Sequence, residues 1–210
     1  MGFKRLLEVI EKLKNTDARN RIEARMRDFR EIGADSNEAI FKELCFCILT
    51  ANFNAQRSIK IQNELGEGFL TLSESRLSKR LGGLGHRFPN VRAKYIVEAR
   101  KHIEKLPEVI GSFDNDNDRR EWLAEHVKGI GYKEASHFLR NIGYTNLAII
   151  DFHIIDLLAR FELIHKPKCL TKRRYLKIEE LLRKIAIETD LNLAELDLYL
   201  WYMETGKILK

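Results

Sequence analysis

Apolar residues recur at helical spacing along almost the whole chain. Ala135, Phe138, Leu139 and Ile142, for example, occupy positions i, i+3, i+4 and i+7, which lie on one face of an α-helix. Helix-forming residues dominate between the three prolines, and each proline can be placed at a helix edge. The pattern predicts an all-α fold with helices over residues 3–14, 17–32, 38–51, 55–65, 73–81, 89–105, 118–127, 132–142, 152–162, 171–188 and 192–205.

The segment 38–51 is apolar on most of its faces, so we expect it to be the central buried helix. Asn37 is its predicted N-cap, because asparagine side chains accept hydrogen bonds from the free N–H groups of a first turn. Pro89 is predicted to lie in the first turn of the helix over 89–105, where the missing N–H of proline leaves no hydrogen bond unmade.

The last segment of the chain has two possible interpretations. Leucines alternate with other residues over 196–200, as they do in a β-strand. However, Asn192 and Glu195 have the spacing of a capping box, which is typical of a helix start. The only other extended run is 147–150, which offers no clear partner strand, so we predict a helix over 192–205.

The most polar stretch of the chain is 111–118, which contains five aspartates and asparagines in succession at 114–118. Polar, turn-rich segments of this kind are typical of connections. We expect 111–118 to connect two helical lobes of a single domain over residues 1–210, a length that suits one domain or two small lobes.

Composition and charge narrow the class of protein. Lys plus Arg total 37 against 31 for Asp plus Glu, so a net charge of +6 permits a polyanionic partner without requiring one. The three cysteines cannot form a four-thiolate iron–sulfur or zinc site, and they do not resemble a secreted disulfide framework. No apolar run approaches the length needed to cross a bilayer, and residues 3–14 suit an amphipathic helix better than a signal peptide. We therefore expect a soluble, intracellular protein with reduced cysteines and no membrane partner.

A tight hairpin is predicted between the helices over 118–127 and 132–142. Gly129 and Gly131 flank Ile130, and two glycines allow a sharp turn while the isoleucine fills the core. The N–H groups of the turn and of the first turn of the next helix then point outward, where they can bind a phosphate. An ordinary helix–helix turn has the same tripeptide, so the hairpin alone does not decide the function.

Two further residues, Lys133 and Asp151, favour a functional hairpin over an ordinary helix–helix turn. Lys133 follows Gly131 by two residues and lies in the first turn of a predicted helix, where the helix dipole disfavours a cation and so favours the free, nucleophilic amine. Asp151 precedes the helix over 152–162, where it can act as an N-cap and as a carboxylate that stabilises positive charge on a sugar. A Gly-apolar-Gly hairpin with this lysine and this aspartate resembles the helix–hairpin–helix DNA glycosylase superfamily.

The resemblance implies a fold and a reaction. It implies an active site in the cleft between two helical lobes, where Lys133 attacks a flipped-out nucleotide and forms a Schiff base, with Asp151 as the catalytic carboxylate. The resemblance also implies that the strand is then cut by β-elimination. The implied partner is double-stranded DNA that contains an oxidised base. The implied contacts to the DNA backbone come from Lys128, Gly129, Gly131 and His153. No metal or cofactor is required, although an alkali ion at the hairpin is possible.

Two further segments resemble the 8-oxoguanine branch of this superfamily, and the chain is similar to its archaeal-type members from about residue 38 to the end. This resemblance implies a monomeric, cytoplasmic, nucleoid-associated protein of a prokaryotic cell. The loop 50–57 and the segment 84–95 supply Asn52, Arg57 and Arg92, which the resemblance places at the gap in the duplex and at the opposite base. Phe88 and Trp201 match the aromatic pair that encloses the flipped base, and Lys210 matches the C-terminal lysine of the lesion pocket. The chain lacks the four cysteines that carry an iron–sulfur cluster in other branches of the superfamily.

Two alternatives remain open from the sequence. A cluster-free glycosylase for oxidised pyrimidines would share Lys133 and Asp151, so these residues do not separate it from an 8-oxoguanine enzyme. A non-catalytic hairpin protein would bind DNA without needing an amine at position 133.

Overall fold

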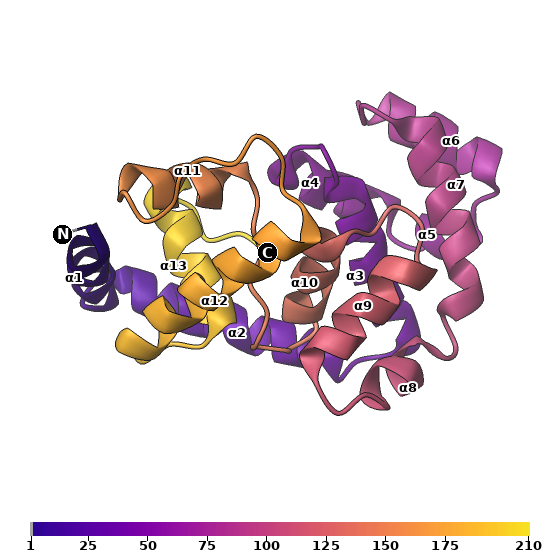
Figure 1. The fold of residues 1–210 in the computed structure, drawn as a ribbon. Coiled ribbons are helices and arrows are strands. Elements are labelled where there is room, and N and C mark those ends of the chain that lie inside the picture. The colour runs from indigo at the N-terminus through magenta and orange to yellow at the C-terminus, as the bar shows by residue number, and fades with distance from the viewer. Residues whose placement is uncertain (1) are drawn as a thin grey trace.

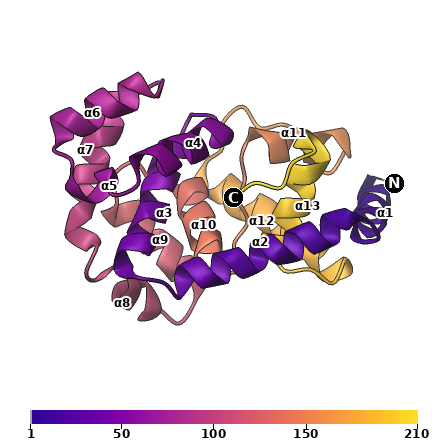
Figure 2. The same ribbon diagram turned by 180° about the vertical axis from the view of Figure 1, so that it is seen from behind.

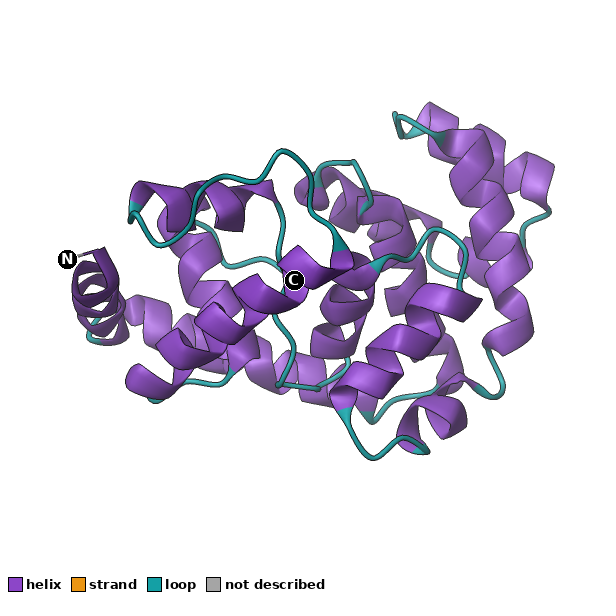
Figure 3. Ribbon diagram, in the orientation of Figure 1, coloured by secondary structure: helices purple, strands orange, loops and turns teal. Residues whose placement is uncertain are grey.

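The computed structural model describes residues 2–210, and this part of the chain contains helices and no strand (Figures 1 and 3). The all-α prediction is confirmed. The helices are α1 (Gly2–Lys14), α2 (Asp17–Gly33), α3 (Asn37–Thr50), α4 (Ala55–Leu65), α5 (Gly68–Thr71), α6 (Glu74–Gly83), α7 (Pro89–Ala99), the 3₁₀ helix η1 (Arg100–His102), α8 (Leu106–Gly111), α9 (Asp116–His126), α10 (Tyr132–Asn141), α11 (Phe152–Arg160), α12 (Lys172–Glu188) and α13 (Leu193–Thr205).

Several predicted helix ends are confirmed and others are wrong. Pro89 opens α7, and Asn192 with Glu195 forms the capping box of α13. The N-cap of α3 is Ser36 rather than Asn37, because the Ser36 hydroxyl accepts from the N–H of Ala39 at 3.2 Å. The Asn37 side chain instead donates to a carbonyl oxygen in the turn before α8.

The predicted helix over 89–105 is also wrong in its second half. The α-helix ends at Ala99, a 3₁₀ turn follows, and a separate short helix, α8, begins at Leu106 with Pro107 in its first turn. Pro107 suits the first turn of α8, because its missing N–H leaves no hydrogen bond unmade there, but it lies beyond the predicted helix and does not account for the end of α7 at Ala99. The four residues of α5 were not predicted because so short a helix has no readable periodicity.

The buried apolar side chains divide into clusters that show how the lobes are built. The largest cluster takes its residues from α3 through α10 and ends at Leu147. A second joins α1 to α11, α12 and α13, beginning again at Ala148, and a third joins α2 to α13. The polar segment 111–118 is a loop only over 112–115, and Ile110 and Leu123 on either side of it lie in the same cluster. Along the chain, the largest cluster gives way to the second between Leu147 and Ala148, and the lobe connection over 111–118 stays a prediction.

The helices α3 and α2 pack against several of the elements that contribute to these clusters. α3 is buried along nearly its whole length, as predicted, and packs against α4, α7 and α10. α2 runs along the back of the molecule and contacts α1 and α13 at one end and α3 and α10 toward the other (Figure 2). Within residues 2–210, no helix combines the length and the apolar character that a membrane crossing needs.

Candidate active site

A cleft of about 1180 Å³ brings together side chains from five separate parts of the chain. They come from the turn between α3 and α4, the loop before α7, one face of α10, the start of α11 with the segment before it, and α13 with the end of the chain after it. Of the residues singled out in the sequence, the cleft is lined by Asn52, Arg57, Phe88, Lys133, Asp151, His153, Trp201 and Lys210. Arg92, Lys128, Gly129 and Gly131 do not line it.

The hairpin between α9 and α10 depends on glycine at one position more than at the other. Gly129 has a φ of +85°, and a Cβ atom there would lie 2.5 Å from Cδ2 of Tyr95. Gly131 has a φ of −105° and forms the N-cap of α10. Ile130 is 5% exposed, so it fills the core as predicted while the backbone turns around it.

Lys133 lies in the first turn of α10 and is partly buried in the cleft wall. Its Nζ atom is 3.8 Å from Oε1 of Glu134, too far for a hydrogen bond, and no closer carboxylate of the described residues pairs with it. Glu134 is held in turn by the N–H of Gly131, which donates to its carboxylate at 3.4 Å. Sequence reasoning missed Glu134, although its spacing from Gly131 is that of a capping box.

Asp151 occupies the N-cap position of α11. Its Oδ1 atom accepts a hydrogen bond from the N–H of Ile154 at 3.0 Å, and Oδ2 accepts none from the described residues. One carboxylate oxygen therefore fixes the helix start while the other is available to the cleft that Asp151 lines. Capping and charge stabilisation are compatible at this position.

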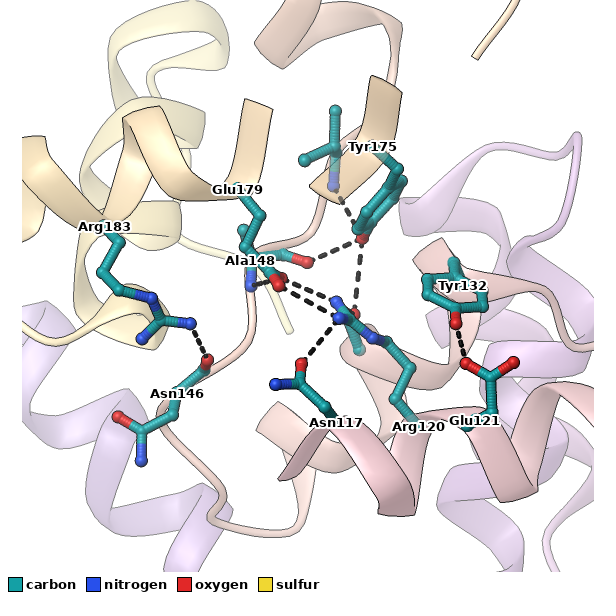
Figure 4. A network of polar contacts seen from close by, with 11 residues as sticks. Asn117, Arg120, Glu121, Tyr132, Asn146, Ala148, Tyr175, Glu179 and Arg183 are labelled. Carbon is teal, nitrogen blue, oxygen red and sulfur yellow. Dashed lines mark hydrogen bonds and ion pairs between the residues drawn. The ribbon is translucent and has the colours of Figure 1, made fainter. Parts of the chain in front are cut away.

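The segment before Asp151 is held by side chains from α12 (Figure 4). Residues 147–150 are buried but belong to no helix or strand, so their backbone groups need other partners. The N–H of Ala148 donates to Glu179 at 2.9 Å, and its carbonyl accepts from the Tyr175 hydroxyl at 2.7 Å. The N–H of Ile150 donates to the same hydroxyl at 3.3 Å. Burial raises the pKa of Tyr175, so the hydroxyl keeps its proton.

The same network reaches the hairpin motif through Arg120 on α9 (Figure 4). Arg120 is 1% exposed and donates to both carboxylate oxygens of Glu179, at 2.6 and 3.0 Å. Its guanidinium also lies over the ring of Tyr132, the first residue of α10, at 4.8 Å. The helix that carries Lys133 and the segment that carries Asp151 are thus tied to one buried ion pair.

A second polar network lies beneath the cleft. Asp197 on α13 pairs with Arg140 on α10, and Arg140 donates to the side-chain oxygen of Asn141 at 2.9 and 3.1 Å. Asn141 donates at 2.6 Å to Glu43, which is 2% exposed within the apolar helix α3. Burial raises the pKa of Asp197 to about 6, with the nearby Asp151 adding to the shift and Arg140 opposing it. Sequence reasoning missed Glu43, Arg140 and Asp197.

The last residue of the chain is anchored by this second network. Nζ of Lys210 donates to Glu43 at 2.7 Å and lies 4.6 Å from the centre of the Phe46 ring. Trp201 on α13 packs edge-on against His153, with ring centres 5.1 Å apart. The C-terminal residue is therefore fixed at the cleft rather than frayed.

The three residues predicted to fill the gap in the duplex and contact the opposite base differ in exposure: Asn52 and Arg57 are exposed, and Arg92 is buried. Asn52 is exposed in the turn after α3, with a φ of +57°, and Arg57 is exposed with its guanidinium 5.2 Å from the Phe53 ring. Arg92 is buried and donates to the carbonyl of Ala51 at 2.6 Å. In this structure Arg92 braces the turn that presents Asn52, and its guanidinium does not reach the cleft.

The residues predicted to contact the DNA backbone lie at the hairpin and at the start of α11. Lys128 is exposed and pairs with Glu98 at 3.0 Å. His153 lines the cleft one helical position after the exposed Phe152. Over residues 2–210, no group of three or more histidine, cysteine, aspartate or glutamate side chains is placed to hold a metal ion.

Comparison with known proteins agrees with this geometry. The chain matches the family Ogg-HhH, 8-oxoguanine DNA glycosylase, over residues 22–191. It is 53% identical to the 8-oxoguanine DNA glycosylase/AP lyase of Korarchaeum cryptofilum over 211 residues, covering 100% of both chains. The same named protein of Methanocaldococcus jannaschii is 52% identical over 206 residues, which covers 98% of this chain and 99% of that one.

Solved structures give the same result. The crystal structure of the Methanocaldococcus jannaschii 8-oxoguanine glycosylase/lyase in complex with 15mer DNA containing 8-oxoguanine superimposes with a TM-score of 0.95 at 51% identity, covering 98% of this chain and 100% of that one. The 8-oxoguanine DNA glycosylase of Thermotoga maritima gives a TM-score of 0.93 at 42% identity, covering 99% and 100%. With its cleft, its hairpin and relatives that match over their full length, the chain belongs to the 8-oxoguanine DNA glycosylase family.

Proposed function

We propose that the protein excises 8-oxoguanine from double-stranded DNA and then cuts the strand at the resulting site. The observation that carries this proposal is the cleft itself, in which the amine of Lys133 and the carboxylate of Asp151 line one space. A nucleophilic amine beside a carboxylate suits covalent removal of a base, in which positive charge develops on the sugar. The names of the full-length relatives support the same substrate and both activities.

The first chemical step is displacement of the base. The target nucleotide leaves the base stack and enters the cleft. The free amine of Lys133 forms a bond to C1′ as the bond from C1′ to the base breaks, and the base leaves with the bonding electrons. The unpaired Oδ2 of Asp151 stabilises the positive charge that develops on the sugar.

The second step cuts the strand. Opening of the sugar ring and loss of a proton from Nζ of Lys133 give a Schiff base between the lysine and C1′. The Schiff base acidifies C2′, so removal of a C2′ proton expels the 3′ phosphate by β-elimination. Hydrolysis of the Schiff base then restores Lys133. No metal ion takes part in these steps.

The lesion pocket is assigned to the aromatic residues and the C-terminus. Phe88 and Trp201, which lie in the cleft lining, enclose the two faces of the flipped base. The α-carboxylate of Lys210 accepts the hydrogen that 8-oxoguanine carries at N7, whereas guanine presents a lone pair there. The ion pair of Lys210 with Glu43 supports this role because it holds the terminal residue at the cleft.

The remaining residues dock the duplex. The hairpin N–H groups of Gly129 and Gly131, with Lys128 and His153, contact backbone phosphates. Asn52 and Arg57 enter the gap left by the flipped base, and Arg92 supports their turn through Ala51. A single chain supplies every residue of this account, so we propose that the protein acts as a monomer on the DNA of a prokaryotic cell.

An alkali ion at the hairpin is compatible with the backbone there. The carbonyl oxygens of Lys128 and Gly129 accept no hydrogen bond from the described residues. Oxygen ligands of this kind suit a hard cation rather than a transition metal. Such an ion would be held by these carbonyls and would favour a phosphate nearby, and the chemistry at Lys133 does not pass through it.

A panel of end-labelled duplexes tests the proposal. Each duplex carries one lesion: 8-oxoguanine, an oxidised pyrimidine or a preformed abasic site, with undamaged DNA as the control. We expect cutting of the 8-oxoguanine and abasic duplexes only. Preferred cutting at the oxidised pyrimidine would favour the alternative glycosylase, and binding without any cutting would favour the non-catalytic hairpin protein.

A further inference from the structure

His137 is a buried histidine whose ring has no hydrogen-bond partner. It lies on α10 one turn after Lys133, is 6% exposed and lines the cleft. Neither Nδ1 nor Nε2 makes a hydrogen bond of normal geometry to a described residue, although the main chain of Lys210 lies near the ring. Buried polar side chains are nearly always hydrogen-bonded in folded proteins, so two unpaired nitrogens on a residue that lines a substrate cleft indicate a partner that arrives with the substrate.

The surroundings of His137 keep the ring neutral. Burial lowers the pKa of His137 well below its ordinary value, and the cations Arg140 and Lys133 lower it further, while the main chain of Lys210 acts in the opposite direction. A neutral imidazole offers one donor and one acceptor, which suits the edge of a base better than a phosphate. The function of this histidine is therefore separate from that of the DNA-binding hairpin.

His137 lies near Lys210, at the same end of the proposed lesion pocket. The ring of Phe46 contacts both: its edge meets His137 with centres 5.5 Å apart, and Nζ of Lys210 lies 4.6 Å from its centre. In a guanine-type base, the oxygen at C6 is the neighbour of N7 on the same edge. A residue next to the group that contacts N7 can therefore meet the oxygen at C6 or the oxygen at C8. A comparison of lesions separates the two, because 8-oxoadenine keeps only the oxygen at C8.

We propose that His137 is a specificity-determining residue that donates a hydrogen bond to the C6 oxygen of the flipped base. The proposal rests on the function proposed above. It means that the protein reads two adjacent groups of the lesion: Lys210 accepts from N7–H, and His137 donates to O6. 8-Oxoguanine and 8-oxohypoxanthine both carry this oxygen, whereas 8-oxoadenine carries an amino group at C6 and so presents a donor where the protein also presents one.

The test compares excision rates for these three lesions under single-turnover conditions. The wild type is expected to excise 8-oxoguanine and 8-oxohypoxanthine about ten- to a hundredfold faster than 8-oxoadenine, the range expected when a site that pairs a polar group meets an analogue lacking the match. His137→Phe is expected to slow the first two and leave the third nearly unchanged, so that the preference disappears. His137→Gln, which keeps a donor, is expected to retain part of it.

Two measurements separate a pocket role from a structural one. Cutting at a preformed abasic site involves no base, so His137→Phe should preserve it. His102→Phe is the matched control, because His102 is a partly buried histidine with an unpaired Nε2 that packs against Trp122 outside the cleft. His102→Phe is expected to leave the lesion preference intact.

The outcomes are distinguishable. A wild type that does not excise 8-oxoguanine would contradict the proposed function itself. A wild type that excises it, with an unchanged preference over 8-oxoadenine in His137→Phe, would overturn the role of His137 alone. A failure of His137→Phe to cut abasic sites would show that this variant is misfolded or misaligned. The lesion preferences of the wild type and of His137→Gln then test the inference. Equal excision of 8-oxoguanine and 8-oxoadenine by the wild type overturns it.

Discussion

Arg120 and Glu179 form a two-point ion pair in the interior, with both guanidinium–carboxylate distances at or below 3.0 Å. Arg120 belongs to the helix before the hairpin, and Glu179 belongs to α12. Because Glu179 also accepts from the N–H of Ala148, the pair fixes an irregular segment relative to the hairpin. The cleft geometry of Lys133 and Asp151 therefore depends on side chains that never touch the substrate.

Tyr175→Phe tests this dependence. The change removes the hydroxyl that pairs with Ala148 and Ile150 while keeping the ring. We expect a loss of about 1–3 kcal/mol in the free energy of unfolding, because buried backbone groups lose a partner. We also expect a lower kcat for excision with little change in KM, since Asp151 is displaced but DNA docking is not.

Denaturant unfolding and steady-state kinetics check both expectations. Tyr202→Phe is the matched control, because Tyr202 on α13 is only partly buried and contacts Arg21 through its ring, which phenylalanine keeps. A Tyr175→Phe protein that is less stable yet keeps the wild-type kcat would show that Tyr175 serves stability alone.

Gly129→Ala and Gly131→Ala should differ sharply. Gly129 has a positive φ and a Tyr95 ring atom 2.5 Å from where a Cβ would lie, whereas Gly131 has a negative φ and its nearest neighbour is a Glu134 oxygen at 3.4 Å. The strain at position 129 is of order 1–3 kcal/mol. We expect Gly129→Ala to weaken binding to damaged and undamaged duplexes alike, as measured by titration, and Gly131→Ala to weaken it much less. Equal effects would argue against a glycine-dependent hairpin.

The raised pKa of Asp197 predicts how the free energy of unfolding depends on pH. Its pKa rises from 3.8 to about 6 on folding, so between these pH values the folded protein holds more of this proton than the unfolded chain does. The contribution of Asp197 is therefore fully present below 3.8 and is lost as pH rises through about 6. In Asp197→Asn this component is absent. Urea unfolding across this range should show the wild type losing stability relative to the variant as pH rises, and a constant difference would contradict the shift.

Deleting Lys210, or extending the chain beyond it, tests the lesion pocket. Either change moves the terminal carboxylate away from the end of the cleft that Glu43 and Phe46 define. We expect 8-oxoguanine excision to fall at least tenfold, the order of one lost charge-assisted hydrogen bond, while cutting at abasic sites changes little. Lys207→Ala is the control for loss of a cleft lysine, because the Lys207 side chain donates to Gln56 rather than to Glu43 and the change leaves the terminal carboxylate in place. A C-terminally extended protein with full excision would remove Lys210 from the pocket.

The sequence predicted what local chemistry determines. Helical periodicity, the Gly129–Gly131 hairpin and the capping box at Asn192 depend on neighbours in the chain, and each of these features is present in the structure. The ends of α3 and α7 were predicted less well, because Ser36 and Asn37 are both good caps and only packing decides between them. The short helices α5 and α8 lack a readable period.

The polar interior was not predictable in the same way. Glu43 stands in an apolar helix, and its partners Asn141 and Lys210 are 98 and 167 residues away. Tyr175 and Glu179 point from α12 into the protein interior, where they form hydrogen bonds with the backbone of the segment 147–150. Such pairs are fixed by tertiary packing, and the sequence pattern alone does not connect them.

Trapping of the covalent intermediate is the most direct test of the central claim that Lys133 is the nucleophile. Borohydride reduces a Schiff base to a stable bond, so the wild type incubated with an 8-oxoguanine duplex should give a protein–DNA adduct. Lys133→Gln should give none while still binding the duplex, because the hairpin amides remain, and Lys128→Gln should still be trapped. Trapping of Lys133→Gln at the wild-type yield would contradict the account and place the nucleophile elsewhere.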